Sequence, residues 1–406
     1  MHILFIEPAF PNNQREFVRA LHSIGCRVTG IGERPYDWLD GELRYWLAAY
    51  ERVRSVTDEQ AVIEAVRRVQ GREWVDRLEA TVEAHILPIA RVREACTIPG
   101  LSARTAYLCR DKVAMKDVLR RAGVPCAASA AISSPHEAQE FAAKVGFPVI
   151  IKPRDAAGAA GTHRAGNWEA LEDVLRATHV VDGASVAMEE FVEGHEGFYD
   201  TLTIEGRVSH DFISHYYPNV LEAMRARWIS PQIVATNRMN EPGYGELLEM
   251  GRQVINSLGI TTSPTHMEWF FGQKGLRFSE IGARPPGVGQ WDVYCAANEF
   301  DLYREWALAV TYGRTDSRPS RRYACGMIAL RPDRDGHISH YEGADEIFRR
   351  YGEWIVAHYF PPPGTPTQPV EAGYMANAWM RIRHPDYDHL REILNAVGEH
   401  LKTRAH

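Results

Sequence analysis

The sequence lacks the features that define several large classes of protein. Its six cysteines include no C-x-x-C pair, so we expect reduced, mostly buried thiols instead of disulfides or a cysteine-bound metal. It has no run of about 18 apolar residues, so we expect no membrane-spanning helix. The opening residues MHILFIEPAF carry neither a basic segment nor a small-residue cleavage site, so we expect no signal peptide and a cytoplasmic location.

An excess of basic charge is also absent. The sequence has 46 Lys and Arg residues against 53 Asp and Glu residues, a formal net charge of −7. Proteins that bind nucleic acid or a membrane surface tend to carry a basic face, so we expect neither kind of partner. A local basic pocket for phosphate groups is compatible with this total. The length of 406 residues and the hydrophobic content of 45% predict two or three globular domains.

The pattern of hydrophobic segments predicts an α/β protein. Near the N-terminus, apolar strands at 3–6 and 26–31 alternate with helices at 14–23 and 58–69. This order is typical of a parallel sheet covered by helices. The Pro/Gly pair at 99–100 predicts a domain boundary.

Two segments, 267–271 and 276–281, predict a β-hairpin joined by the three-residue turn 273–275, in which glycine takes the left-handed position. Counting back from this turn places Glu268 directly opposite Glu280. Two facing carboxylates repel one another unless a cation lies between them, and oxygen ligands on rigid strands suit Mg²⁺. The hairpin therefore predicts a metal site, with two solvated glutamates on an exposed face as the alternative.

A lysine followed by a loop of small residues predicts a phosphate site. Lys152 ends an apolar strand, and the segment behind it contains Gly158, Gly161 and Thr162. Small residues let backbone N–H groups approach an anion closely, and the lysine adds a point charge. Because the lysine precedes the glycines, this is not a Walker A loop. A plain turn is the alternative.

A third segment, 188–196, has the pattern of a strand that crosses between two lobes. Its apolar residues lead into Glu189, Glu190 and Glu196. Backbone groups released at such a crossing can pair with a purine edge, and a nearby carboxylate can hold ribose hydroxyls. The alternative is an acidic strand end at the protein surface.

In their order and spacing, these segments resemble the ATP-grasp superfamily over residues 101–289. The helix opened by Arg110-Asp111-Lys112 and followed by Gly123-Val124-Pro125 resembles the start of the family's small nucleotide lobe. The sequence Glu-Ile-Gly-Ala-Arg at 280–284 resembles the family segment that carries a metal ligand and an arginine for the transferring phosphoryl group.

The resemblance implies roles for the residues that match the family pattern. It implies phosphate contacts by Lys112 and by a catalytic Lys152, and a phosphate cover that includes Gly158, Gly161 and Thr162. It implies adenine contacts by the backbone of Glu190 and Val192, an amino-group contact by Glu189 and a ribose contact by Glu196. It implies Mg²⁺ ligation by Glu268 and Glu280, and a catalytic role for Arg284.

One residue departs from the family pattern. The family usually has asparagine two residues after the second metal glutamate, where this chain has Gly282. Either one Mg²⁺ is bound more loosely, or His266, on the same face of the hairpin, or water completes the shell. Whether one ion or two bind is left open. The resemblance implies ATP and Mg²⁺, with Mn²⁺ as the alternative ion.

We therefore expect an α/β protein with the ATP-grasp fold and a domain order that resembles biotin-carboxylase-like members. The expected parts are an N-terminal Rossmann-like α/β domain and a small nucleotide lobe, followed by a larger α+β C-terminal part. That larger part comprises a lobe with the metal site and a strand-rich closing domain. The four domains are expected at residues 1–100, 101–187, 188–314 and 315–406.

The resemblance implies an ATP-dependent carboxylate–amine ligase that forms an amide or peptide bond through an acyl phosphate and releases ADP and phosphate. The similarity is greatest to amino-acid and dipeptide ligases, with small-molecule carboxylate and amine partners, and a homodimer is compatible with it. The run 211–227 is rich in Tyr, His and Arg, so we expect His215, Arg225 and Arg227 to contact substrate, with a solvated loop as the alternative. The alternatives are a carboxylase that uses bicarbonate and a nucleotide-binding regulator without catalysis.

Overall fold

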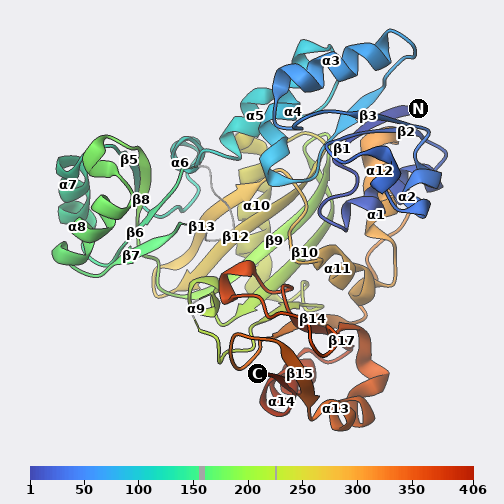
Figure 1. The fold of residues 1–406 in the computed structure, drawn as a ribbon. Coiled ribbons are helices and arrows are strands. Elements are labelled where there is room, and N and C mark those ends of the chain that lie inside the picture. Colours follow the sequence, from blue (N-terminus) through green and yellow to red (C-terminus); the bar gives the residue numbers. More distant parts are fainter. Residues whose placement is uncertain (155–160, 225) are drawn as a thin grey trace.

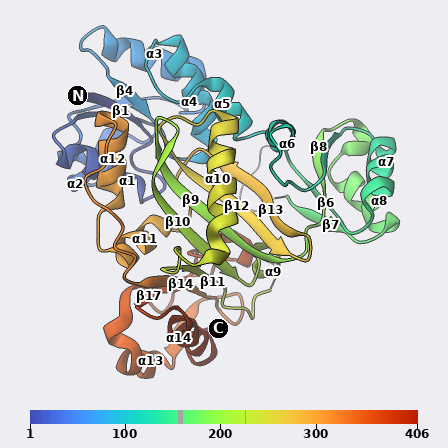
Figure 2. The same cartoon turned by 180° about the vertical axis from the view of Figure 1, so that it is seen from behind.

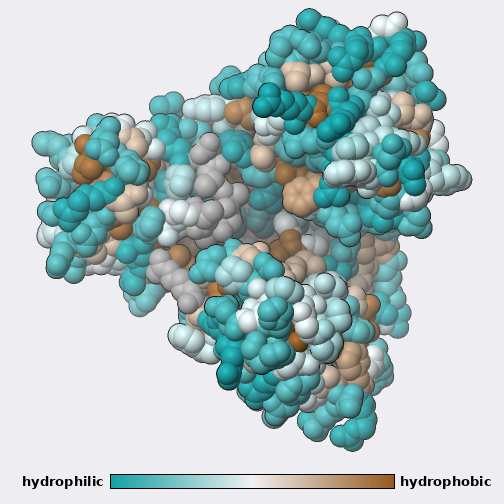
Figure 3. Space-filling model, viewed as in Figure 1, coloured by the Kyte–Doolittle hydropathy of each residue, from teal (hydrophilic) through white to brown (hydrophobic). Residues whose placement is uncertain are grey.

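The computed structural model describes residues 1–154, 161–224 and 226–406. Gly158 and Arg225, which the sequence predicts to contact phosphate and substrate, lie outside these ranges. Three parts surround a central hollow: an N-terminal domain, a small lobe, and a large sheet with the C-terminal part attached (Figure 1; Figure 3). Among the described residues, no helix combines the length and the apolar character that crossing a membrane requires.

The N-terminal domain contains a parallel sheet of four strands in the order β3-β2-β1-β4. The strands are β1 His2–Ile6, β2 Arg27–Gly32, β3 Ala49–Arg52 and β4 Arg77–Glu79. The helices are α1 Gln14–Ser23, α2 Gly41–Trp46, α3 Glu59–Gln70 and α4 Glu83–Ala95. Every residue of β1 is buried, as expected for a central strand covered on both faces. The predicted Rossmann-like sheet is confirmed.

The small lobe contains an antiparallel sheet in the order β5-β8-β6-β7, with two helices beside it (Figure 1). Its elements are β5 Ser129–Ile132, α7 Pro135–Val145, β6 Val149–Lys152, β7 His163–Ala165, α8 Trp168–Ala177 and β8 Val186–Glu190. Helices α5 Ala103–Leu108 and α6 Lys112–Arg121 precede it. The side chain of Asp111 caps α6 by accepting from two backbone N–H groups, so the helix begins at Lys112.

An antiparallel sheet of eight strands forms the centre of the molecule, in the order β13-β12-β9-β10-β11-β14-β17-β16. Its strands are β9 His195–Ile204, β10 Arg207–Tyr217, β11 Gln232–Ala235, β12 Ser263–Gly272, β13 Gly275–Gly282, β14 Ala324–Leu330, β16 Ile355–Tyr359 and β17 Ala378–His384. The short helix α9 Val220–Ala223 follows β10, and α10 Gly245–Leu258 crosses the back of the sheet (Figure 2).

Apolar packing joins the N-terminal domain to helices α11 Gln290–Asn298 and α12 Leu302–Tyr312. The ring of Phe17 in α1 meets the ring of Trp306 in α12 edge-on, with centroids 4.9 Å apart. At the C-terminal end, β15 Ile338–Glu342 pairs with β18 Lys402–Ala405, beside α13 Ala344–Tyr351 and α14 Tyr387–His400.

The hairpin of β12 and β13 has the predicted pairing of Glu268 with Glu280, but for a different reason. Gly272 pairs with Gly275, so the turn has two residues and the predicted three-residue turn is wrong. A register shift between Glu268 and Trp269 then inserts one extra residue in β13, as a β-bulge does. The two differences cancel, and the carboxylates face one another.

Candidate active site

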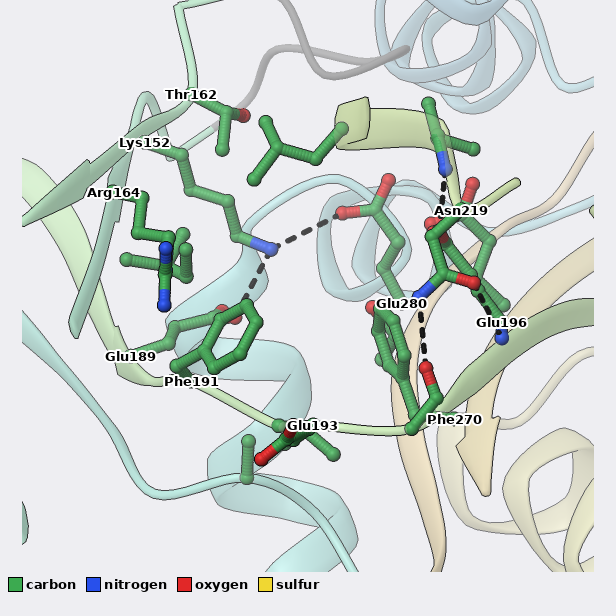
Figure 4. A pocket seen from close by; sticks show the side chains of 18 of the residues that line it. Lys152, Thr162, Arg164, Glu189, Phe191, Glu193, Glu196, Asn219, Phe270 and Glu280 are labelled. Carbon is green, nitrogen blue, oxygen red and sulfur yellow. Dashed lines mark hydrogen bonds and ion pairs between the residues drawn. The ribbon is translucent and has the colours of Figure 1, made fainter. Parts of the chain in front are cut away.

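A cavity of about 700 Å³ lies between the small lobe and the large sheet. Its walls come from α6, from β6 and β8, from β12 and β13, and from the segment after β10 (Figure 4). A volume of this size suits a small-molecule ligand such as a nucleotide. Nine of the predicted residues line it: Lys112, Lys152, Thr162, Glu189, Glu190, Val192, Glu196, Glu268 and Glu280.

The two predicted phosphate lysines lie beside one carboxylate. The Nζ of Lys112 lies 3.5 Å from Glu280 Oε2. The Nζ of Lys152 lies 3.6 Å from the same oxygen (Figure 4). Burial opposes the charge of Lys152, but the charges of Glu189 and Glu280 outweigh it and raise the pKa of Lys152. The lysine therefore stays an ammonium ion inside the cavity, where it can contact a phosphate.

The sequence analysis missed a third lysine, Lys116. It lies one turn after Lys112 on α6, is fully buried, and its Nζ is 2.6 Å from Glu189 Oε1 in an ion pair. Lys152 Nζ is 3.0 Å from the other oxygen of Glu189. Although burial opposes its charge, these two ammonium groups lower the pKa of Glu189 to about 2. The spacing of four residues from Lys112 was the available signal, since it puts both lysines on one helix face.

The predicted adenine segment forms the apolar side of the cavity. Strand β8 ends at Glu190, and Phe191 and Val192 follow it along the cavity wall. The guanidinium of Arg164 lies 4.7 Å from the centre of the Phe191 ring, a cation–π contact. Phe270 of β12 adds a second aromatic wall. An aromatic, apolar slot of this kind suits a planar base.

Glu196, the predicted ribose carboxylate, stabilises the segment after β10. Its Oε2 accepts a hydrogen bond of 2.7 Å from the backbone N–H of Val220. Asn219 accepts a bond of 3.1 Å from the Glu196 N–H and donates one of 2.8 Å to the carbonyl of Gly194. Burial, and then the charge of Glu268, raise the pKa of Glu196 to about 8.

The metal prediction rests on Glu268 and Glu280, which face one another on the sheet surface that lines the cavity. His266 is beside them, with Nε2 3.7 Å from Glu268 Oε1 and Nδ1 2.7 Å from Asp200 Oδ1. Burial opposes a charge on His266, but Asp200 outweighs it and raises the pKa to about 9. The bond to Asp200 occupies Nδ1, so Nε2 is the ring nitrogen that faces Glu268. In the part of the chain that the structure describes, no three His, Cys, Asp or Glu side chains form a metal cluster.

Arg284, the predicted phosphoryl arginine, lies at the end of the same hairpin. Its Nε donates a hydrogen bond of 2.7 Å to Glu83 Oε2, and its Nη1 donates one of 2.8 Å to the carbonyl of Pro285. Burial opposes its charge, but Glu83, Asp200 and Glu268 outweigh it and raise the pKa of Arg284. Glu83 was not predicted, because no motif marks it in the sequence.

His215 and Arg227, the two predicted substrate residues within the described ranges, do not line this cavity. His215 pairs with Gly197, the neighbour of Glu196, so its side chain lies on the opposite face of the sheet from Glu196. There its ring nitrogens are 2.8 Å from His195 Nε2 and 2.8 Å from the hydroxyl of Tyr244. Arg227 pairs instead with exposed Asp335, 2.5 Å away. Gly161 has a left-handed φ of +65° and precedes Thr162, which does line the cavity.

Comparison with known proteins finds similarity to an ATP-binding domain and to amino-acid ligases. Residues 111–197 match the family described as "Carbamoyl-phosphate synthase L chain, ATP binding domain". An L-arginine-specific L-amino acid ligase of Bacillus subtilis is 28% identical over 220 residues, 53% of this chain and 52% of that protein. An alanine–anticapsin ligase of Bacillus subtilis strain 168 is 23% identical over 235 residues, 52% of this chain and 48% of that protein. The chain thus spans about half the length of these curated relatives.

Solved structures show the fold over the whole chain. The crystal structure of an L-amino acid ligase from Bacillus licheniformis matches with a TM-score of 0.77 at 16% identity, covering 100% of this chain and 98% of that one. The N5-carboxyaminoimidazole ribonucleotide synthetase from Thermotoga maritima matches with a TM-score of 0.69 at 16% identity, covering 100% and 99%. With the family match over residues 111–197, these structures show that the chain has the ATP-grasp fold.

Proposed function

We propose that this chain is an ATP-dependent carboxylate–amine ligase that joins amino acids or small peptides through an acyl phosphate. One observation carries the proposal: Lys112 and Lys152 both lie within 3.6 Å of Glu280. Glu280 shares its hairpin with Glu268, and Arg284 follows two residues after that hairpin. Cations for a triphosphate and carboxylates for a metal ion thus converge at one end of a nucleotide-sized cavity.

The residues of the hairpin fit a divalent cation. Glu268 and Glu280 offer oxygen donors from paired strands, which suits Mg²⁺ or Mn²⁺. The neighbouring carboxylate of Glu196 has a raised pKa, caused first by burial and then by the charge of Glu268, so negative charge is crowded here. When bound, Mg²⁺ would neutralise charge on the β- and γ-phosphates. A measurement of the binding stoichiometry would determine whether one ion or two bind.

In the proposed reaction, a carboxylate oxygen of the first substrate attacks the γ-phosphorus of ATP. The bond between the β–γ bridging oxygen and that phosphorus breaks, and ADP leaves. Lys112 and Lys152 hold the phosphates, and Arg284 stabilises the charge on the transferring phosphoryl group. The amine of the second substrate then attacks the acyl carbon, phosphate leaves, and the amine nitrogen loses a proton. No side-chain nucleophile is required, because the acyl phosphate is the activated species.

The names of the relatives support amino acids as the substrate class. Three of the proteins similar to this chain are named as an L-arginine-specific L-amino acid ligase, an alanine–anticapsin ligase and a D-alanine–D-alanine ligase. Each is named for joining an amino acid to a second molecule. We propose the same class here, without a commitment to a particular amino acid.

The experiment that tests this function is ADP release over a panel of amino acids, with mass spectrometry of the products. In a parallel series hydroxylamine replaces the amine substrate, because hydroxylamine attacks a free acyl phosphate and gives a hydroxamate. A ligase gives substrate-stimulated ADP release and a hydroxamate from at least one acid. ADP release with bicarbonate alone would instead identify a carboxylase, and ATP binding without ADP release would identify a regulator.

A further inference from the structure

The carboxylate of Glu83 connects three parts of the molecule. Glu83 is the first residue of α4 in the N-terminal domain. Its Oε2 accepts from Arg284 Nε at 2.7 Å, and its Oε1 accepts from Arg110 Nη1 at 3.1 Å. Its backbone carbonyl accepts from the same Nη1 at 2.9 Å. Arg284 follows β13 and Arg110 precedes α6, so one glutamate links the N-terminal domain to the large sheet and to the entrance of the small lobe.

Glu83 reaches Arg284 because residue 282 has no side chain. A Cβ on Gly282 would lie 3.0 Å from Glu83 Oε2 and 3.5 Å from Arg284 Nε. The first of these distances is shorter than ordinary van der Waals contact. Glu83, Glu280, Gly282 and Arg284 also line a small cavity of about 20 Å³. The asparagine that the family usually has at this position would need the space that the Glu83 carboxylate occupies.

We infer that Glu83 is a positioning residue for Arg284, and that Gly282, which has no side chain, leaves room for the Glu83 carboxylate. The inference rests on the proposed ligase function. The bond to Glu83 and the bond from Nη1 to the Pro285 carbonyl fix the plane of the guanidinium. A guanidinium held in advance needs little reorganisation when charge develops on the phosphoryl group. The N-terminal domain therefore takes part in the chemistry through Arg284.

A plain ion pair between two domains is the competing explanation. The side chains of Glu83 and Arg284 are 22% and 16% exposed, so loss of either partner would destabilise the folded chain in both cases. The two explanations differ in the kinetics of the protein that remains folded. A positioning residue changes kcat and leaves ATP binding intact, whereas a structural pair changes the amount of active enzyme without changing its pH profile or KM.

The test is a double-substitution cycle on ligation. Glu83→Ala should lower kcat by about 10- to 100-fold while the KM for ATP stays within about twofold, because a misplacement of about 1 Å costs rate on this scale. Gly282→Asn should lower kcat similarly, since its side chain displaces the Glu83 carboxylate. In Glu83→Ala/Gly282→Asn the asparagine fills the freed space, so the combined loss should be smaller than the product of the single losses by at least about fivefold. Glu83→Gln, which keeps one acceptor oxygen, should lose less than Glu83→Ala.

Two matched variants control for the substitutions themselves. Gly166→Asn lies at an exposed position outside the cavity, where a Cβ meets nothing within 4 Å, and it should leave kcat unchanged. Glu64→Gln removes an exposed carboxylate from neighbouring α3 and should also be silent. The positioning role would be overturned if the fall in kcat of the double variant equals the product of the two single falls. A rise in the KM for ATP as large as the fall in kcat would overturn it too.

A second readout keeps this inference separate from the proposed function. The Arg284 Nε–H should exchange slowly with solvent in the ¹⁵N NMR spectrum, because it is bonded to Glu83 in a largely buried site. The signal is assigned by its absence in Arg284→Lys. In Gly282→Asn the exchange should be faster by about 10-fold or more. If the wild type forms no hydroxamate from any acid, the ligase proposal fails, and unchanged exchange in Gly282→Asn overturns the positioning role whatever the activity.

Discussion

The Nζ of Lys116 lies 2.6 Å from Oε1 of Glu189, and both side chains are buried in the cavity wall. Lys152 takes the other oxygen of Glu189 at 3.0 Å (Figure 4). The carboxylate of Glu189 therefore already forms ion pairs with two lysines. The contact with the adenine amino group that the resemblance implies has to form alongside these pairs. Burial, and also the charge of Lys152, lower the pKa of Lys116, and the carboxylate of Glu189 opposes this shift.

Lys116→Met removes one partner of this buried group. Glu189 keeps Lys152, so the free energy of unfolding should fall by about 1–3 kcal/mol, less than the loss for a carboxylate left with no cation. Urea unfolding measures it. In Lys116→Met/Glu189→Leu, part of the stability should return, because no buried carboxylate remains to be compensated. A single variant as stable as the wild type would contradict this account.

Lys152→Ala should weaken ATP binding. The triphosphate loses a charge-assisted contact worth about 1.5–3 kcal/mol, so the affinity measured by calorimetry should fall by about 10- to 100-fold. Turnover should be lost with it. Lys144→Ala, at an exposed position on α7, is the matched control and should bind ATP like the wild type. Unchanged affinity in a folded Lys152→Ala protein would rule out the phosphate assignment.

Glu280→Gln keeps the shape of the side chain and removes its charge. The nucleotide should still bind, while half-maximal turnover requires a higher Mg²⁺ concentration, because an amide oxygen is a weaker ligand than a carboxylate. Glu268→Gln should shift the titration in the same direction, and by less if His266 or water completes the metal shell. Mg²⁺ titrations that superimpose on the wild type would show that these two glutamates are not ligands.

Arg284→Ala should abolish most hydroxamate formation but leave ATP bound. The guanidinium acts on charge that develops at the transferring phosphoryl group, a contact worth roughly 3 kcal/mol or a factor near 10² in rate. Calorimetry and the hydroxamate assay separate the two effects. Equal losses of ATP affinity and of rate would assign Arg284 to ground-state nucleotide binding instead.

His215 makes the stability of the fold depend on pH. Burial, and then the charges of His195 and Arg391, lower the pKa of His215 to about 3 in the folded chain, compared with about 6.5 in the unfolded chain. The unfolded state therefore binds the proton more readily, and stability falls as the pH drops below about 6.5. For this histidine the loss between pH 7.5 and 5.5 is on the order of 1 kcal/mol.

Urea unfolding at the two pH values measures this dependence. His215→Gln should show a smaller loss between them than the wild type. The exposed histidine variant His136→Gln is the control and should keep the wild-type loss. If His215→Gln loses as much stability as the wild type, His215 is not the group that titrates.

The hairpin shows which structural features the local sequence pattern can predict. The alternation of side chains along 263–282 placed Glu268 opposite Glu280 from the sequence alone, since the period of two is a property of any strand. The length of the turn was predicted wrongly. A two-residue turn with a one-residue bulge and a three-residue turn without a bulge place Glu268 opposite the same residue, so the sequence pattern does not distinguish them. The parallel N-terminal sheet was likewise predictable, as its strands and helices alternate over short distances.

The order of motifs along the chain determined the prediction of the ATP-grasp fold and of Lys112, Lys152 and Glu280 as residues of one site, and all three line the cavity. Only the tertiary structure decided that His215 lies on the far face of the sheet, because the pairing of β9 with β10 sets which neighbour it opposes. Only the tertiary structure joined Glu83 to Arg284 across 201 positions of the chain. Periodicity and spacing report on neighbours within one helix or hairpin, whereas a contact between domains depends on how their packed faces meet.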